Sequence, residues 1–536
     1  MVFTQFFFWG FLAFVLLFYT VLHKHNKMRN AYLFVVSLFF YYKTSGLFVS
    51  ILLFSTVSDY LIAWLIYGSK QKSIKQLWVA LSVSINLMLL AYFKYAYFFT
   101  ESFNEFFSTD MLAFNHFAHW ANSATGTHFS VDQILLPVGI SFYTFQTISY
   151  TVDVYKEKIA PVRSILDFGF YVSFFPQLVS GPIVRAADFI PQLYKPYNLT
   201  RNKFGLASFL ILQGLIKKVV IGDYIAVNFI DKVFANPTMF SGFENLMALY
   251  GYSLQVYVDF SGYTDMAIGV ALLMGFELPQ NFNSPYKAKN VGDFWKRWHM
   301  SLSSWLKDYL YIPLGGNRKG STGTVVCAIV ILTFITLLAA KMWVLFTFAG
   351  LLSVVILMAA WIPRFRRALT ENTNLMITML LGGLWHGASW QFVIWGGLNG
   401  LGLMVYKFWR KISPYEQFNN TAAIALKIFI TFNFITFTRI WFRSESMETS
   451  MQILDQISGN FSASLIPDVL FAYRYVFITM LIGYIIHWLP STTKEWYKET
   501  FIKLPIIVQV AVATVVVFVV YQAMSSDLVP FIYFQF

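Results

Sequence analysis

Two histidines lie where an ionisable side chain is costly, and both have the chemistry of a general base. His386 lies in the apolar run 375–405, and His299 lies among tryptophans and cations in residues 283–320. An ionisable group at bilayer depth costs about 2.5–3.5 kcal/mol on insertion, so each such group is a functional candidate. An imidazole needs only a hydroxyl within reach and a pKa near neutrality to remove the hydroxyl proton. The two histidines therefore predict acid–base chemistry on a hydroxyl.

The run around His386 reads LMITMLLGGLWHGASWQFVIWGGLNGLGLMV. His386 lies about 16 Å along a helix that starts with this run, which predicts mid-membrane depth. Small residues let a neighbouring helix or a ligand approach the backbone closely, and three flank the histidine: Gly382, Gly383 and Gly387. With Trp385 and Trp390 they favour a lined cavity. The alternative is a neutral histidine hydrogen-bonded to a neighbouring helix.

Residues 283–320 are too charged to span a membrane. Their apolar residues at helical spacing predict a basic, tryptophan-rich amphipathic helix at the cytoplasmic interface; they are Trp295, Trp298, Leu302, Trp305 and Tyr309. Asp293 is expected to cap the helix start. Nearby polar and cationic groups are candidates for holding a phosphorylated donor: Lys296, Arg297, Ser303, Asn317 and Arg318. The alternative is a helix that only anchors the chain.

A polar stripe runs through residues 245–274. Gln255, Asp259 and Tyr263 are four residues apart and share one helical face. Together with Trp385 they are candidates for lining a polar tunnel. The alternative is hydrogen bonding between helices that fixes packing. Asp265 lies on a different face from Asp259, so the two are not expected to form a carboxylate pair.

Metal chemistry and familiar nucleophile motifs find little support in the sequence. His299 and His386 have no Cys, Asp or Glu at ligand spacing, and Cys327 is the single cysteine, so no metal site is predicted. No G-x-S-x-G elbow, Gly-rich phosphate loop or H-E-x-x-H zinc motif occurs. General-base catalysis by imidazole is what remains plausible.

The composition is that of a membrane protein. Of 536 residues, 57% are hydrophobic and only 12% are charged, whereas soluble proteins carry about 25% charged residues. Disordered, collagen-like and disulfide-rich secreted classes are excluded. The net charge of +13 is attributed to cytoplasmic loops. The expected partners are therefore membrane lipids, and no nucleic-acid partner is expected.

Apolar runs long enough to cross about 30 Å of hydrocarbon predict an all-α polytopic protein. We expect about 11–14 membrane segments, with re-entrant or interfacial helices among them, in a single domain over 1–536. Basic loops at 23–30, 69–76 and 156–163 are expected in the cytoplasm, and the acidic loop 100–133 outside. The first run, 4–22, lacks a cationic start and a cleavage site, so it is read as a retained span.

The apolar stretch 168–180 has cations at both ends, which conflicts with a simple crossing. A re-entrant or broken segment resolves the conflict, with the break at Pro176, Gly181 and Pro182. The alternative is an ordinary Pro/Gly loop at a helix end.

Several motifs resemble the membrane-bound O-acyltransferase family, in particular its bacterial branch of alginate O-acetyltransferase and teichoic acid D-alanyl transfer proteins. The core motifs lie within about 130–410, and the match covers much of the chain. The motifs are LPVGISFYTFQTISYTVDVY, FFPQLVSGPIVR, QVYVDFSGYTDMAIGVALLMGFELPQNFNSPY, DFWKRWHMSLSSWLKDYLYIPLGGNRKG, MLLGGLWHGASWQFVIWGGLNG and the C-terminal PFIYFQF. One departure is residues 321–373, which look like an inserted hairpin of two crossings.

The resemblance implies a ring of helices around a transmembrane funnel or tunnel. It implies that His386 is the intramembrane catalytic histidine and that His299 is the second family histidine, nearer the cytoplasmic mouth. It also implies acyl transfer, with acetyl-CoA as the expected donor and no permanently bound cofactor. The expected acceptor is an extracytoplasmic polysaccharide or a partner acetyltransferase, reached across the bacterial inner membrane.

Three alternatives remain open from the sequence. Within the family, the chain could transfer D-alanine from a carrier protein to teichoic acid. A polytopic transporter or flippase would use the same tunnel without covalent chemistry, and is expected to show internal repeats that this sequence lacks. A scaffold subunit without catalysis would tolerate the loss of His386.

Overall fold

The computed structural model describes residues 3–126, 128, 130–179, 181–317, 323–324, 326–328 and 363–524. Over these residues the chain is helical and contains no β-strand. Three predicted features lie outside the described residues: Arg318, most of the hairpin expected over 321–373, and the C-terminal PFIYFQF.

The helices of the first third of the chain are α1 (Phe6–Leu22), α2 (Asn26–Ser45), α3 (Val49–Gly68), α4 (Lys72–Phe93), α5 (Ala96–Phe107), α6 (His116–Thr125), α7 (Ile140–Tyr155), α8 (Ile165–Ser173), α9 (Phe175–Leu178) and α10 (Ala186–Leu193). The middle third contains α11 (Arg201–Leu215), the π-helices η2 (Ile216–Asp223) and η3 (Ala226–Ile230), α12 (Asp231–Ala235), α13 (Gly242–Leu273), α14 (Val291–Trp295), α15 (Met300–Trp305) and the π-helix η6 (Leu306–Tyr311).

The last third contains α18 (Pro363–His386), α19 (Trp390–Ile412), α20 (Thr421–Arg443), α21 (Met447–Gly459), α22 (Ile466–Ala472), α23 (Arg474–Trp488), α24 (Ser491–Lys503) and α25 (Ile506–Ala523). Short 3-10 turns connect some of these elements: η1 (Gly46–Phe48), η4 (Pro237–Met239), η5 (Pro285–Lys287), η7 (Pro414–Gln417) and η8 (Ala463–Leu465).

Polar caps fix where several of these helices begin. Ser241 and Glu244 form a capping box at the start of α13, and the Asn420 side chain accepts from the Ala423 amide at the start of α20. Such caps satisfy amides that have no partner inside the helix. They explain why long apolar sequences start their helices at defined residues.

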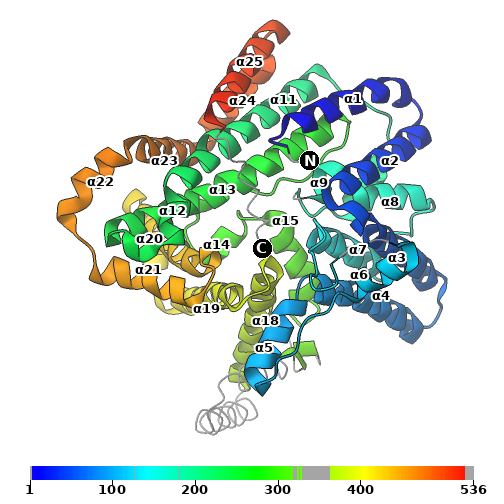
Figure 1. The fold of residues 1–536 in the computed structure, drawn as a ribbon, viewed down its shortest axis with the longest axis horizontal. Coiled ribbons are helices and arrows are strands. Elements are labelled where there is room, and N and C mark those ends of the chain that lie inside the picture. The colour runs from blue at the N-terminus through cyan, green and yellow to red at the C-terminus, as the bar shows by residue number, and fades with distance from the viewer. Residues whose placement is uncertain are drawn as a thin grey trace.

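The helices are arranged around a short central segment (Figure 1). α14 and α15 lie near the middle of the view, with α13 and α11 on one side and α18, α19 and α20 on another. α14 contacts both α19 and α20, and α18 contacts η6. The segment that carries His299 is therefore held inside the protein by helices from distant parts of the chain.

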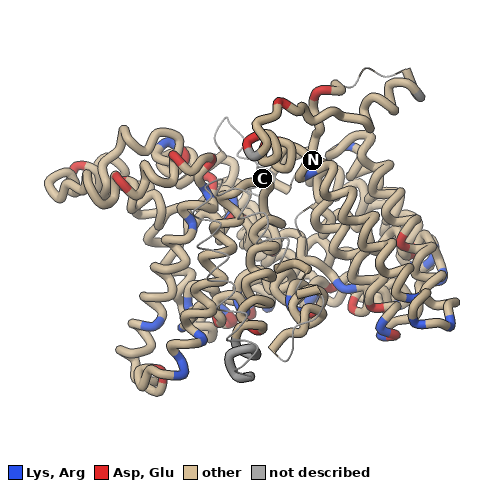
Figure 2. Tube along the Cα trace, turned by 90° about the horizontal axis from the view of Figure 1, so that it is seen from below, with Lys and Arg blue, Asp and Glu red and all other residues tan. Residues whose placement is uncertain are grey.

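Charged residues lie mainly toward two opposite faces, and Lys and Arg are most frequent along the lower edge in Figure 2. Among the described residues five helical segments are long and apolar enough to cross a membrane: Asn26–Gly68, Lys72–Phe93, Arg201–Ala235, Thr421–Arg443 and Ile506–Ala523. The pair Ala463–Ala472 and Arg474–Trp488, bent by 88°, passes the same test together. The predicted all-α polytopic membrane class is confirmed, although several predicted runs are divided into shorter helices.

The break predicted in 168–180 is present and lies within the protein. α8 and α9 meet at Phe174, and Pro176 occupies the first turn of α9. The described side chains of 168–179 are all buried. Irregular backbone in a membrane protein is tolerated where protein surrounds it, and the buried side chains here show that protein does.

Two predicted helices are wrong in detail. Residues 375–405 do not form one helix, because α18 ends at His386 and α19 starts at Trp390. Residues 283–320 do not form one interfacial helix either, because α14 and α15 are separated by a turn and Trp298 is 1% exposed. The cap of α14 is Asn290, not Asp293, which lies in the first turn and pairs with Arg297.

Small residues let α18 and α19 pack closely. A Cβ added at Gly396 would collide with the Met379 carbonyl oxygen, whereas one at Gly397 would meet only Leu380 Cδ2 at 3.4 Å. We expect Gly396→Ala to lower the stability by about 1–3 kcal/mol through overpacking. Gly397→Ala, the matched control, should leave it unchanged or raise it. Thermal unfolding in detergent measures both, and equal shifts for the two variants would contradict this account of the packing.

Candidate active site

His386 is the last residue of α18, and its side chain is 3% exposed. Its Nδ1 lies 2.7 Å from the Gly382 carbonyl oxygen one turn earlier. A carbonyl can only accept, so Nδ1 carries the proton of the neutral ring and Nε2 has the lone pair. This arrangement gives Nε2 the orientation and tautomer of a proton acceptor.

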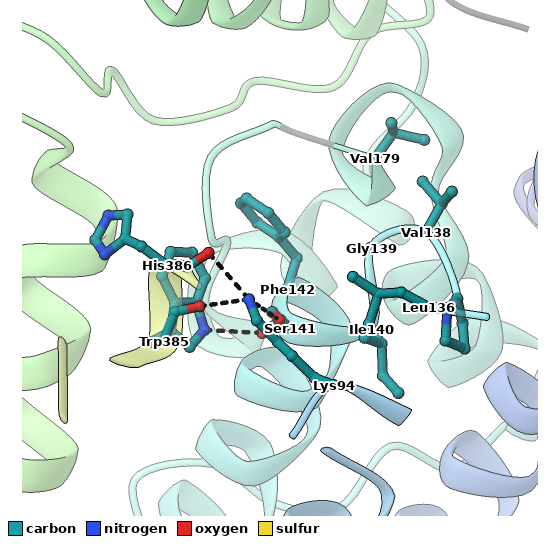
Figure 3. Close-up of a pocket in the computed structure, with 11 residues that line it drawn as sticks. Lys94, Leu136, Val138, Gly139, Ile140, Ser141, Phe142, Val179, Trp385 and His386 are labelled. Carbon is teal, nitrogen blue, oxygen red and sulfur yellow. Dashed lines mark hydrogen bonds between the residues drawn. The ribbon is translucent and has the colours of Figure 1, made fainter. Parts of the chain in front are cut away.

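Lys94, just beyond α4, holds the end of α18 (Figure 3). Its ammonium donates to the carbonyl oxygens of Trp385 at 2.6 Å and His386 at 3.2 Å, and lies 3.5 Å from the Ser141 hydroxyl. A cation at a helix C-terminus satisfies carbonyls that have no partner inside the helix and offsets the negative end of the dipole. The imidazole of His386 points away from Lys94 in Figure 3, so Lys94 positions the backbone of the histidine rather than its ring.

A cavity of about 100 Å³ lies beside these residues. Its lining comprises Lys94, residues 136–142, Val179, Trp385 and His386. The Trp385 indole donates to the Ser141 carbonyl at 3.4 Å, which ties this lining together. A small space beside His386 is thus built from four separate parts of the chain.

His299 precedes α15 and is fully buried, in a left-handed conformation with φ of 44°. Left-handed backbone is rare for a residue with a side chain, and it persists only where neighbours hold it. Asn281 supplies this restraint, because its carbonyl accepts from the Met300 amide at 2.9 Å and its Oδ1 from the Ser301 amide at 3.1 Å. The turn therefore aims the imidazole inward.

Asn281 also orients the imidazole of His299. The His299 Nδ1 lies 3.3 Å from Asn281 Oδ1, which already accepts from the Ser301 amide and hydroxyl. Those two donors identify this atom as the oxygen, so Nδ1 donates and Nε2 has the lone pair. His299 and His386 thus share the same tautomer.

Aromatic rings connect the two histidines. The Trp385 ring centroid lies 6.0 Å from that of His299 and 5.1 Å from that of His386. Trp395 and Phe442 also contact the ring of His386, and Phe260 contacts that of His299 edge to face. The structure thus brings His299, His386 and Trp385 into one buried cluster, and their catalytic roles stay predictions.

The polar stripe on α13 is placed differently from this cluster. Phe260 makes the contact with His299, whereas Asp259 pairs with Lys218 at 2.6 Å and the Tyr263 ring packs against that of Phe3, with 4.5 Å between centroids. Gln255 is buried on the same helix. These contacts favour the packing alternative for Asp259, and the tunnel role of the stripe stays a prediction.

Asp259 and Asp265 do not form a carboxylate pair. Asp265 pairs with Lys217 at 2.6 Å, while Asp259 shares Lys218 with Asp223. Asp259 and Asp265 therefore pair with two different lysines of η2.

The residues predicted to hold the donor have different partners and, where the structure describes them, form no hydrogen bond or ion pair with one another. Lys296 is exposed, and Arg297 pairs with Asp293 at 2.9 Å. The Ser303 hydroxyl donates to the Trp298 carbonyl at 3.2 Å, and Asn317 accepts from the Tyr311 hydroxyl at 2.5 Å. Donor binding by these residues stays a prediction.

A cationic cluster that the sequence did not reveal surrounds Tyr309 at the end of the same segment. Arg185 lies 4.4 Å from the Tyr309 ring centroid, Lys156 5.5 Å and Lys158 5.9 Å, and the Tyr309 hydroxyl donates to Asp153 at 2.6 Å. Burial, then the nearby Lys158 ammonium, lowers the pKa of Lys156. Two of these cations also pair with carboxylates, Lys158 with Asp153 at 3.3 Å and Arg185 with Asp308 at 3.4 Å, so the cluster contains both signs of charge.

Two further residues of the site were missed, for different reasons. Lys94 lies within the apolar run 78–99, and the cost of a cation there would have singled it out. Asn281 gives no such signal, because its importance depends on the turn at His299. A third buried histidine, His487, accepts from the Tyr286 amide through Nε2 at 3.2 Å, which is a structural role.

Comparisons with known proteins identify relatives of this chain. The model of the membrane-bound O-acyltransferase family matches residues 65–372, more than half of the chain. A peptidoglycan O-acetyltransferase of Helicobacter pylori is 34% identical over 86% of this chain and 80% of its own length. A protein named probable alginate O-acetylase, from Pseudomonas putida, is 34% identical over 80% of this chain and 74% of its own.

A teichoic acid D-alanyltransferase of Bacillus subtilis is more distant, at 28% identity over 58% of this chain and 69% of its own length. The family match and the long alignments agree with the helical architecture and the apolar spans. The chain is a multi-pass integral membrane acyltransferase and belongs to the membrane-bound O-acyltransferase family.

Proposed function

We propose that this acyltransferase is an O-acetyltransferase that takes acetyl groups from cytoplasmic acetyl-CoA and passes them to an acceptor on the other side of the bacterial inner membrane. The observation that carries the proposal is the single buried cluster in which Trp385 contacts both His299 and His386. Relatives named as O-acetyltransferase and O-acetylase support acetyl as the group transferred.

His386 acts as the general base in this proposal. The acceptor hydroxyl attacks the thioester carbon and forms the new C–O bond, while its proton passes to Nε2 of His386. The C–S bond then breaks, and the thiolate leaves as the thiol after it takes up a proton. His299 positions the thioester or assists the departing thiolate. Because its Nδ1 proton is donated to Asn281, it can protonate the sulfur only after Nε2 has first taken up a proton.

The acceptor reaches the site from outside. α4 starts at Lys72, within the basic segment 69–76, and rises about 33 Å over its 22 residues. Lys94 and the cavity lie at its opposite end, next to the acidic stretch 100–133. Basic loops favour the cytoplasm and acidic loops the outside, so the end of α4 next to Lys94 is expected to face outside.

The donor approaches from the cytoplasmic side, with its phosphates near the cations around Tyr309. Lys156 and Lys158 lie in the basic loop 156–163, which is expected in the cytoplasm. Arg185 is one of the cations that flank the apolar stretch 168–180. Phosphate oxygens accept strong hydrogen bonds from guanidinium and ammonium groups. Acetyl-CoA is a substrate in this proposal and not a resident cofactor.

The acceptor is a polysaccharide of the cell envelope or a serine on an extracytoplasmic partner acetyltransferase. The names of the relatives, which refer to peptidoglycan and alginate, favour a carbohydrate as the final acceptor. D-alanyl transfer to teichoic acid has less support, because that relative aligns at lower identity over a shorter part of the chain.

Incubation of the purified protein with radiolabelled acetyl-CoA tests this function. We expect label to appear on added peptidoglycan or polysaccharide fragments, or on a co-purified partner, and not to appear with His386→Ala. Label that crosses a proteoliposome membrane while still attached to CoA would indicate transport instead. Labelled D-alanine transferred from its carrier protein, with acetyl-CoA inert, would favour the D-alanyl alternative.

Lys94→Met tests whether this lysine positions His386. We expect kcat to fall about 10–100-fold, because loss of the bonds to the carbonyls of Trp385 and His386 lets the imidazole shift. KM for acetyl-CoA should stay within about threefold, and Lys94→Arg should recover part of the rate. Lys43→Met, an exposed lysine in the last turn of α2, is the control. Wild-type kcat in folded Lys94→Met would contradict the role.

A further inference from the structure

A buried arginine packs against aromatic rings that adjoin the two histidines. Arg439, on α20, is 1% exposed, and neither its Nε nor its Nη2 has a hydrogen-bond partner among the described residues. It also forms no ion pair with any described Asp or Glu. The next arginine on the helix differs, because Arg443 pairs with Asp231 at 3.0 Å.

Aromatic rings hold the guanidinium in place. Its Cζ lies 4.5 Å from the Trp298 ring centroid and 5.2 Å from that of Phe442. Trp298 adjoins His299 in the chain, and Phe442 contacts the His386 ring at 5.6 Å between centroids. The cation is therefore fixed between the surroundings of one histidine and those of the other.

These rings stabilise the charge only in part. A cation over an aromatic face gains about 0.5–2 kcal/mol, whereas taking a charge out of water costs several kcal/mol even after relaxation. The Tyr286 hydroxyl, which also lies beside the guanidinium, is neutral and donates to the Ser253 carbonyl. No anionic oxygen of the described residues accepts from Nε or Nη2, so these N–H groups can bind one.

We infer that Arg439 binds the acyl carbonyl oxygen of the thioester and stabilises the oxyanion formed when the acceptor hydroxyl attacks. The inference rests on the proposed function. As the C–O bond forms, the carbonyl π electrons move onto oxygen, where Nε–H and Nη2–H donate to them. When the C–S bond breaks, those electrons return to the carbonyl and the thiolate departs. Preorganised donors in a buried site are effective because they need no reorganisation as charge develops.

The test combines kinetics with thermal unfolding of the full-length protein in detergent. For Arg439→Met and Arg439→Gln we expect kcat for acetyl transfer to fall about 100-fold or more, with KM for acetyl-CoA within about threefold. Arg439→Lys should retain an intermediate rate, because it keeps a charge but not the planar pair of donors. Arg443→Met, four residues along the same helix, should keep kcat within about threefold.

Stability separates substrate binding from a packing role. Replacing an unpaired buried charge with an apolar side chain of similar length should leave Tm unchanged or raise it, so Arg439→Met should be inactive but at least as stable as the wild type. A clear drop in Tm, or failure of both neutral variants to fold, would overturn the inference in favour of packing. Folded variants with more than one third of wild-type kcat would also overturn it. If the wild type itself transfers no acetyl group, the proposed function fails first.

Discussion

Replacing His386 with alanine should lower acetyl transfer about 100- to 10,000-fold while the protein remains folded and inserted. The expected loss is that of a general base, because the Nδ1 bond to the Gly382 carbonyl leaves Nε2 as the proton-accepting nitrogen. Both the single-turnover rate and kcat should fall, since the chemical step itself is slowed.

Radiolabel transfer under single-turnover conditions measures this effect, and size-exclusion chromatography with thermal unfolding establishes that the variant is folded. His116→Ala is a matched control, because this histidine is exposed at the start of α6. Full activity in His386→Ala would refute the assignment. It would also favour the scaffold reading, in which the chain contributes no catalytic group.

The second large effect concerns His299, for which alanine should also cause a major loss of transfer. Alanine has a cost of its own at this position, because the backbone is left-handed with φ of 44°. His299→Asn is therefore the sharper variant: asparagine tolerates this conformation better than most residues, so it removes the imidazole and keeps the turn.

We expect both variants to lower kcat, to raise KM for acetyl-CoA, or to do both, since His299 positions the donor or assists the leaving thiolate. Steady-state kinetics at varied acetyl-CoA separates the two contributions. Asn281→Ala should weaken the same step, because it removes the Oδ1 that holds the His299 ring together with the Ser301 amide and hydroxyl. Unaltered donor affinity combined with unaltered turnover in His299→Asn would count against any role for this histidine.

The sequence located both histidines because each is a polar group that hydropathy does not explain. It describes their surroundings less well, because the apolar periodicity continues through residues at which the helices end. α18 stops at His386, and the chain turns before Trp390, so the histidine lies at the tip of a helical hairpin and not midway along one span. The apolar residues around Trp298 have helical spacing, yet the chain turns at His299 between the short helices α14 and α15.

The remaining features depend on contacts between distant residues, which periodicity does not report. Lys94 reaches carbonyls almost 300 positions later, and Asn281 matters only through the turn that it stabilises. Arg439 falls near the end of the apolar run 422–441, where a cation looks like an ordinary helix-end residue. Its burial beneath Trp298 becomes visible only when α14 and α20 are brought together.

The hydrogen bond from the Lys94 ammonium to the Trp385 carbonyl oxygen joins residues that are 291 positions apart. This separation affects when the site can form during synthesis of the protein. At about 5–20 residues per second, a ribosome adds Trp385 about 15–60 s after Lys94. The first helices must therefore enter the membrane while the ammonium still lacks these carbonyl partners. Completion of the site is thus a late event of biogenesis, and nascent chains that end before α18 should be the forms most dependent on insertases and most exposed to membrane proteases.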